Sequence, residues 1–221
     1  MRSLEYVECI FAELQKALGT YTPPIVSRKK PHIPHTVFTV LISCILSLRT
    51  KDAVTAGASE RLLRTHNTPK QILMLSEEEI AQRIYPVGFY KTKAKRIREL
   101  AQTLLEKYDG QVPADFDELL KLKGVGRKTA NIVMVYGHHK HGYIPIDAHC
   151  HRIPNRIGWV QTTTPDQTEE QLKKILPERF WDDFNDLFVL FGQTICLPIS
   201  PWCSKCPISK YCQQVNVTVK R

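Results

Sequence analysis

The chain has 221 residues, of which 31 are Lys or Arg and 22 are Asp or Glu, so its formal net charge is +9 with His neutral. Hydrophobic residues make up 43% and charged residues 24% of the chain, which is ordinary for a globular protein and excludes wholesale disorder and a membrane-embedded class. The excess of cationic side chains favours polyanionic partners such as nucleic acids.

The first half of the chain begins with two predicted helices. The N-terminal residues combine Glu5, Glu8 and Glu13 with apolar residues at helical spacing, which predicts an amphipathic helix and not a signal peptide. The segment from Thr36 to Leu48 is apolar and nearly uncharged but too short to cross a bilayer, so it predicts a buried helix. With neither a signal peptide nor a membrane span, the protein is expected in the cytoplasm.

Further helices are expected where a capping residue precedes an apolar pattern. Thr68-Pro69 has the sequence of an N-cap followed by proline, and Ser76 with Glu79 has the spacing of a capping box. Aromatic and aliphatic residues from Trp181 to Ile195 form a broad stripe at helical spacing. Because strand-like alternation is almost absent, the sequence predicts an all-α fold.

Two other segments carry weaker signals. A basic run is expected to form one charged face of a helix, part of it facing nucleic acid. This run consists of Lys91, Lys93, Lys95, Arg96 and Arg98. The residues from about Gln213 onward are polar and aliphatic without a clear pattern, so a loose tail is expected there.

A glycine-rich turn, Gly124-Val125-Gly126, interrupts a helical pattern that resumes at once after it. Backbone N–H groups at the start of the second helix can hold a phosphate oxygen, and the nearby Lys123 and Arg127 suit a nucleic-acid backbone. The alternative is a plain corner between two helices, with glycines for close approach.

Two residues near this turn are candidates for chemistry. Lys128 lies in the first turn of the second helix, where the helix dipole and apolar walls disfavour its ammonium form, so it can become a nucleophilic amine. The alternative is a solvated surface lysine. Asp147 follows an apolar segment and opens another helical run, so it is either a functional carboxylate or a plain N-cap, and the two roles are compatible.

Four of the seven cysteines fall within 17 residues, which favours a metal site in a reducing compartment over a disulfide framework. They are Cys196, Cys203, Cys206 and Cys212. Four thiolates can bind zinc or a [4Fe–4S] cluster. Only one Cys-x-x-Cys pair is present, whereas zinc ribbons usually contain two, which modestly disfavours zinc.

Three stretches resemble endonuclease III, a family of helix-hairpin-helix DNA glycosylases with a C-terminal iron–sulfur cluster. They are Leu122–Asn131, Ile146–Arg156 and the four-cysteine segment, within a likeness that extends from about Val37 to Cys212. The resemblance implies a six-helix barrel with the hairpin at residues 31–140, and an iron–sulfur domain made of residues 1–30 and 141–221. It also implies that the four cysteines hold a [4Fe–4S] cluster.

The resemblance implies a bifunctional DNA glycosylase and AP lyase of base excision repair. In that family the hairpin lysine attacks C1′ of an oxidised pyrimidine nucleotide and expels the base, and the Schiff base then permits β-elimination of the 3′ phosphate. Lys128 matches this lysine, and Asp147 matches the family's essential carboxylate. The implied partner is double-stranded DNA with damaged bases or abasic sites, bound by a nucleoid-associated monomer.

DNA contacts are expected in three places. By the resemblance, Arg49, Phe89 and His149 match positions that fill the gap left by the extruded base and contact the opposite strand. The hairpin residues Lys123, Gly124, Val125, Gly126 and Arg127 are expected to contact phosphate, and a rigid cysteine segment is expected to hold Lys205 and Lys210 toward DNA phosphates. Three residues depart from the family pattern, because Arg49 replaces a common Gln, Lys123 a frequent Pro, and Phe89 an aliphatic residue.

Alternatives from other classes remain at this point. A mismatch-directed thymine, uracil or adenine glycosylase of the same superfamily fits the fold, but those that are monofunctional usually lack the hairpin lysine. A non-catalytic helix-hairpin-helix DNA-binding module with a structural metal would need neither Lys128 nor Asp147. An iron–sulfur electron carrier is disfavoured by the basic hairpin.

Overall fold

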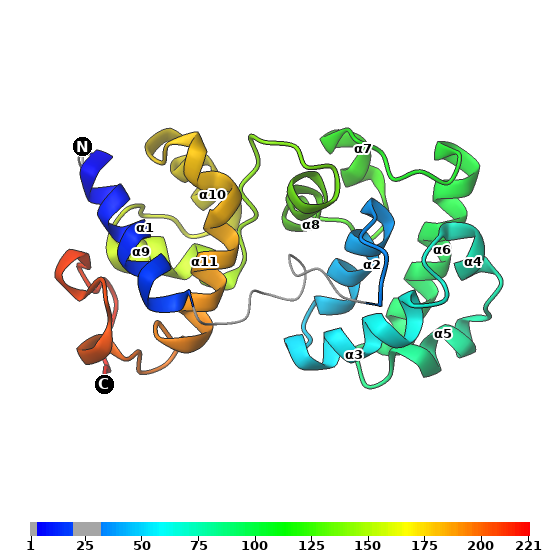
Figure 1. The fold of residues 1–221 in the computed structure, drawn as a ribbon, viewed down its shortest axis with the longest axis horizontal. Helices are drawn as coiled ribbons and strands as arrows, with labels where there is room; N and C mark the ends of the chain where they lie inside the picture. Colours follow the sequence, from blue (N-terminus) through cyan, green and yellow to red (C-terminus); the bar gives the residue numbers. More distant parts are fainter. Residues whose placement is uncertain (1–3, 20–31) are drawn as a thin grey trace. The chain divides into compact units, whose positions relative to one another are not determined.

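The computed structural model describes residues 4–19 and 32–221 (Figure 1). No strand occurs in these ranges, which confirms the predicted all-α fold. None of the helices in them combines the length and the apolar composition that a membrane span requires. The chain divides into unit 1, Met1–Pro24 with Ile144–Arg221, and unit 2, Ile25–Tyr143. The first expected domain boundary, at residues 30/31, lies outside the described residues. The second was expected between residues 140 and 141, and the two units divide between Tyr143 and Ile144.

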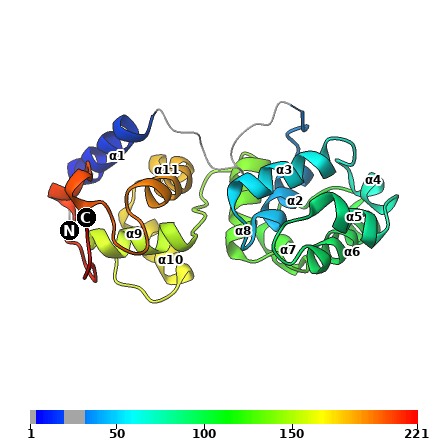
Figure 2. The same ribbon diagram turned by 90° about the horizontal axis from the view of Figure 1, so that it is seen from below.

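Unit 2 is built around one buried helix. Its elements are α2 (Val37–Ser47), α3 (Asp52–Leu63), α4 (Pro69–Leu73), α5 (Glu77–Ile84), α6 (Tyr90–Tyr108), α7 (Phe116–Lys121), α8 (Arg127–Ile132) and a π-helical turn η1 (Val133–Gly137). Every residue of α2 from Phe38 to Leu46 is buried, and the helix packs against α3, α6, α8 and η1 (Figures 1 and 2). The uncharged composition of α2 therefore reflects burial on all sides.

Capping side chains fix where several helices of unit 2 begin. Thr36, Thr68 and Ser76 each accept a hydrogen bond from the backbone N–H three residues later, and the side chain at that later position bonds back to the cap. These capping boxes satisfy N–H groups that have no partner inside the helix. The helix starts predicted at Thr68 and Ser76 are confirmed.

Unit 1 joins the N-terminal helix to the last third of the chain. Its elements are α1 (Leu4–Leu18), α9 (Ala148–Ile157), α10 (Pro165–Ile175), α11 (Trp181–Thr194) and the 3-10 turns η2 (Glu178–Phe180), η3 (Cys203–Lys205) and η4 (Ser209–Tyr211). Phe11 of α1 is fully buried, with ring centroids 4.4 Å from Phe180 and 5.8 Å from Phe188. The amphipathic N-terminal helix therefore completes a core made mainly by residues beyond 143.

The prediction of a loose tail from about Gln213 onward is wrong. Backbone N–H groups of Gln213 and Val215 donate to carbonyls of Ile157 and Arg156, at 3.3 and 3.0 Å. The last residue is held at both backbone groups, because Arg221 N–H donates to Pro201 (2.8 Å) and its carbonyl accepts from Ser204 (2.9 Å). These bonds follow no helical or strand period, so a periodic pattern cannot reveal them.

Candidate functional site

The predicted glycine turn connects α7 to α8. Gly124 has a φ of +88°, a left-handed conformation that glycine adopts without strain, and Val125 N–H closes the turn on the Leu122 carbonyl at 3.0 Å. Gly126 is the N-cap of α8 and, being glycine, makes no side-chain capping bond. The start of a helix is suited to an anion, because its first N–H groups have no partner inside the helix.

The cationic side chains of this turn have neighbours of their own. Lys123 Nζ lies 2.8 Å from Glu99 Oε2, and this hydrogen bond lowers the pKa of the Glu99 carboxyl. The Arg127 guanidinium lies 5.5 Å from the centroid of the Phe116 ring. The charge of Lys123 is thus partly offset by Glu99, a residue that the sequence analysis did not single out, whereas Arg127 is held against an apolar ring.

The two candidates for chemistry both lie at helix starts. Lys128 is half-buried in the first turn of α8, in unit 2. Asp147 is half-buried in unit 1 and caps α9, with its Oδ1 accepting from His149 N–H and Cys150 N–H, both at 2.8 Å. The N-cap interpretation of Asp147 is therefore confirmed. The two capping hydrogen bonds are accepted by Oδ1, and this capping role is compatible with a functional carboxylate.

Two arginines one turn apart on α9 hold the segment in which the cysteines begin. Arg152 donates to the Cys196 carbonyl at 2.6 Å, and Arg156 donates to the carbonyls of Leu197 (2.7 Å) and Pro198 (2.6 Å). Arg152 Nη2 also lies 3.1 Å from His149 Nδ1. The one local sign of this role in the sequence is the spacing, because arginines four residues apart share one face of a helix.

Arg49 and Phe89 lie together in unit 2, although 40 positions separate them in the sequence. Arg49 lies in the turn between α2 and α3, and Phe89 in the turn between α5 and α6. The Arg49 guanidinium lies 5.9 Å from the Phe89 ring centroid, and the Phe89 residue is 64% exposed. Both have positive φ, 52° and 58°, a conformation that is rare outside glycine and recurs at functional sites.

The prediction that the basic run forms one charged face of α6 is wrong at Lys93. Lys91, Lys95 and Arg96 are exposed, but Lys93 is only 5% exposed and its ammonium faces the end of α2. Its position could have been predicted, because Lys93 lies four residues before Ile97 on the face that buries the apolar side chains of this helix.

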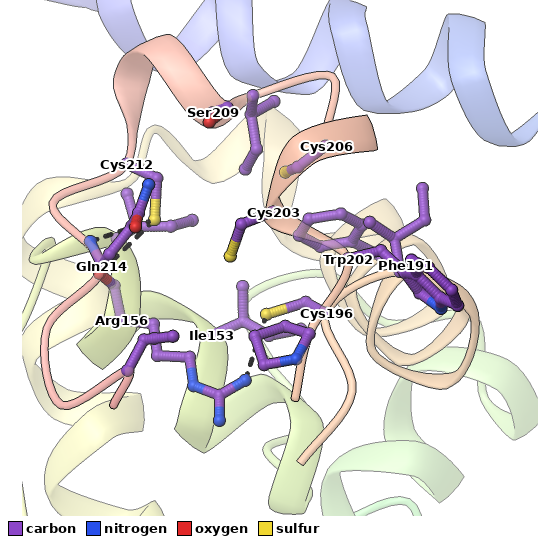
Figure 3. Close-up of a pocket in the computed structure, with 15 residues that line it drawn as sticks. Ile153, Arg156, Phe191, Cys196, Trp202, Cys203, Cys206, Ser209, Cys212 and Gln214 are labelled. Carbon is purple, nitrogen blue, oxygen red and sulfur yellow. Dashed lines mark hydrogen bonds between the residues drawn. The ribbon is translucent and has the colours of Figure 1, made fainter. Parts of the chain in front are cut away.

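The four clustered cysteines share one pocket of unit 1. The segment from residue 196 to residue 212, here called the cysteine loop, turns their side chains toward the pocket beside α9 (Figure 3). Most of the other lining side chains are apolar, among them Ile153, Phe191 and Trp202, and Arg156, Ser209 and Gln214 are the polar ones. Within the described residues, no three His, Cys, Asp or Glu side chains gather closely enough to ligate one metal ion.

Four thiols on one pocket are a donor set that zinc or a four-iron cluster can use. A tetrahedral zinc ion needs sulfur ligands about 2.3 Å away and therefore about 3.8 Å from one another. A four-iron cube spreads its thiolate ligands further apart. Burial raises the pKa of the Cys206 thiol to about 12 and also raises that of Cys212, so these groups ionise to thiolates only where a bound cation compensates the charge.

Hydrogen-bond donors also face these sulfur atoms. The N–H of Gln214 lies 3.4 Å from Cys212 Sγ, and Arg156 Nη1 lies 3.5 Å from Cys196 Sγ. Donors to sulfur are a feature of iron–sulfur sites, where they stabilise the ligating thiolates. The residues present therefore fit an iron–sulfur cluster.

The lysines of the cysteine loop lie against aromatic rings. Lys205 Nζ is 5.2 Å from the Trp202 ring centroid, and Lys210 Nζ is 4.8 Å from that of Tyr211. Lys210 also lies 3.7 Å from Glu13 of α1. The two cation–π contacts restrain the long side chains of Lys205 and Lys210.

Comparison with known proteins gives a consistent result. A model of the HhH-GPD superfamily base excision DNA repair protein matches residues 42–178. Endonuclease III of Thermotoga maritima is 47% identical over 176 residues, covering 80% of this chain and 82% of that protein.

Solved structures with related sequences have the same fold. A trapped endonuclease III–DNA covalent intermediate matches with a TM-score of 0.83 and 31% identity over 97% of each chain. A thermostable thymine-DNA glycosylase matches with a TM-score of 0.81 and 25% identity, over 95% of this chain and 96% of that one.

Proposed function

Because the chain belongs to the endonuclease III family of the HhH-GPD superfamily, we propose that it is a bifunctional DNA glycosylase and AP lyase of base excision repair. Its substrate is double-stranded DNA that contains oxidised pyrimidines or abasic sites. The observation that carries the proposal is Lys128, a half-buried amine in the first turn of the helix that follows the glycine turn. A relative of the same fold forms a covalent complex with DNA.

Lys128 and Asp147 divide the chemistry between them. The neutral amine of Lys128 attacks C1′, and the bond from C1′ to the base breaks with its electron pair leaving on the base. Asp147 stabilises the positive charge that develops on the sugar and helps remove the proton of the attacking amine. Ring opening gives a Schiff base. Loss of a C2′ proton then breaks the C3′–O bond and releases the 3′ phosphate.

Residues of both units supply the proposed DNA contacts. The start of α8, with Gly124, Val125 and Gly126 shaping the turn, binds a phosphate, and Lys123 and Arg127 add positive charge. Arg49 and Phe89 enter the gap left by the extruded base, where an aromatic ring can stack and a guanidinium favours guanine edges or phosphate. His149, Lys205 and Lys210 are further proposed contacts.

Cys196, Cys203, Cys206 and Cys212 are the proposed ligands of a [4Fe–4S] cluster. When bound, the cluster supplies a compact iron–sulfur core that cross-links the loop and is capable of redox chemistry. The chain's own residues then stabilise the site, because Arg156 and the Gln214 N–H donate to ligand sulfurs and Arg152 anchors the first cysteine. The proposed role of the rigid loop is to present Lys205 and Lys210 to DNA.

Borohydride trapping tests the proposal directly. Reduction of the Schiff base is expected to give a stable covalent complex with DNA that carries thymine glycol or an abasic site. Lys128→Gln is expected to abolish the complex, whereas Lys107→Gln, the same change at an exposed position of α6, keeps it. Lack of trapping by folded, iron-loaded protein with the wild-type sequence would contradict the lyase activity.

A mismatch-directed glycosylase is the second candidate, favoured by the structural match to a thymine-DNA glycosylase. A panel of duplexes separates the two candidates. Release of thymine from a G·T mismatch, at a rate above that for thymine glycol, favours the second. Preferential action on oxidised pyrimidines with strand cleavage favours the first.

A further inference from the structure

Lys93 is a buried lysine that binds the end of α2. Its Nζ lies 2.9 Å from the Leu46 carbonyl, 2.5 Å from the Leu48 carbonyl and 3.2 Å from Thr50 Oγ1. Carbonyls at the end of a helix have no partner inside that helix and carry the negative end of its dipole. The ammonium therefore replaces its lost hydration with the last carbonyls of α2.

Thr50 extends this network to a second turn. Its Oγ1 accepts from the N–H of Gly88 at 3.2 Å as well as from Lys93. The backbones of the two turns are in close contact, because a Cβ built on Gly88 would lie only 2.7 Å from the Arg49 carbonyl oxygen. Lys93 therefore holds the turn between α2 and α3, and Thr50 ties that turn to the one between α5 and α6.

These are the turns that carry Arg49 and Phe89. A left-handed backbone at a residue other than glycine costs about 1 kcal/mol or more, so each conformation persists only where the surroundings enforce it. For Arg49 the enforcing contacts lie on both sides, at Leu48 and Thr50. Phe89 directly follows Gly88, whose N–H is bonded to Thr50.

We propose that Lys93 is a positioning residue that fixes Arg49 and Phe89 as one preorganised wedge for the gap left by an extruded base. The inference rests on the proposed function, because it assumes that these two side chains enter duplex DNA. Lys93 acts through the two turns and does not itself touch DNA, since its ammonium is enclosed by the carbonyls it binds. Burying an ammonium costs desolvation free energy, which a neutral side chain of similar length, such as methionine, would not cost. The three hydrogen bonds of Lys93 therefore explain why a charged side chain occupies this position.

The need for the wedge differs between two substrates. Extrusion of a nucleotide from a duplex leaves a gap and an unpaired opposite base, and it costs several kcal/mol. A single strand with an abasic site has neither. Positioning of Arg49 and Phe89 therefore matters for the duplex and not for the single strand, whereas Lys128 is needed for both.

The experiment compares Lys93→Met with Lys107→Met, the same change at an exposed position of the same helix. Single-turnover strand cleavage is measured on an abasic site in duplex and in single-stranded DNA. For Lys93→Met, we expect the duplex rate to fall by roughly tenfold or more, since misplacement by about 1 Å can cost as much as a hundredfold. The single-strand rate should change by less than about twofold. Lys107→Met should change neither.

Thr50→Val provides the second variant. It leaves Lys93 bound to the two carbonyls and removes the acceptor of the Gly88 N–H. We expect a smaller loss, again confined to the duplex. If Lys93→Met does not fold, this variant decides the question.

Two outcomes would overturn the positioning role. One is an unchanged duplex rate, and the other is an equal loss on duplex and single strand, which would indicate a general structural defect. Failure of the proposed function is distinct, because the wild-type protein would then neither cleave nor trap the single-stranded abasic site.

Discussion

Asp147 combines a structural bond with a proposed chemical role, and two substitutions separate them. Asp147→Asn keeps an oxygen that accepts from His149 and Cys150, so the unfolding free energy should change by less than about 0.5 kcal/mol. Because the negative charge is lost, base release should slow by roughly a hundredfold or more. Asp147→Ala removes the cap too and should cost about 1 kcal/mol.

Urea unfolding and single-turnover base release measure the two effects. Nearly normal base release by Asp147→Asn would reduce Asp147 to a helix cap.

Lys93 is expected to give the folded state a pH dependence of known sign. Burial, and then the charge of Arg96, lower the pKa of Lys93 from 10.5 to about 8. Between these values the unfolded chain binds a proton that the folded chain does not, so the contribution of Lys93 to the unfolding free energy rises with pH across this window. Below about pH 8 both states are protonated and the contribution is constant.

The measurement is the difference in unfolding free energy between the wild-type protein and Lys93→Met at several pH values. Other titrating groups cancel in this difference. It should rise from about pH 8 to 10.5. A flat difference for Lys93→Met would contradict the lowered pKa.

At the scale of elements, the packing of α11 against the start of α9 depends on a glycine. A Cβ on Gly192 would lie 2.3 Å from His149 Nδ1 and 2.8 Å from its Cβ, closer than atoms can approach. Gly192→Ala should therefore destabilise the protein by about 1–3 kcal/mol, as overpacked sites do. It should also slow base release, since His149 adjoins the helix start that carries Asp147.

Gly57→Ala is the matched control. In the interior of α3, a Cβ at residue 57 would lie 3.2 Å from Nη1 of Arg61, whose Nε and Nη2 donate to the carbonyls of Arg83 and Tyr85. Gly57→Ala should cost less than Gly192→Ala, because only a side-chain end has to shift and alanine gains about 0.5–1 kcal/mol in a helix interior. Thermal or urea unfolding should therefore shift less for Gly57→Ala than for Gly192→Ala. Equal shifts would mean that the close approach of α11 is not a constraint.

Elements defined by local signals could be predicted from the sequence. The capping boxes at Thr68 and Ser76 lie within a few residues of the N–H groups they satisfy, so the sequence carries all the information. The π-helical turn at Val133–Gly137 has no such signal. Lys93 was assigned to the wrong face because its basic neighbours obscured its helical spacing to Ile97.

The candidate site divides in the same way. The glycine turn, Lys128, Asp147 and the cysteine spacing belong to local patterns, so the sequence alone is enough to propose them. The approach of Arg49 to Phe89 and the bonds from Arg152 and Arg156 to the cysteine loop join distant segments, so only the folded chain reveals them.

At the scale of the whole molecule, the proposed cluster should be visible in the purified protein. We expect broad absorption near roughly 400 nm and about four iron atoms per chain. Cys203→Ala should lose the absorption, whereas Cys44→Ala, which changes a buried thiol of unit 2, should retain it. A colourless protein with one zinc ion per chain would contradict the iron–sulfur assignment.

The composition of unit 1 from two separate segments has a consequence for synthesis on the ribosome. The apolar face of α1, which includes Ile10, Phe11 and Leu14, packs on a core supplied by residues beyond 143. At about 5–20 residues per second, translation of the roughly 120 residues of unit 2 takes about 6–24 s. For that time the apolar face of the nascent α1 has none of these partners to pack against, so unit 2 can fold before unit 1 is complete.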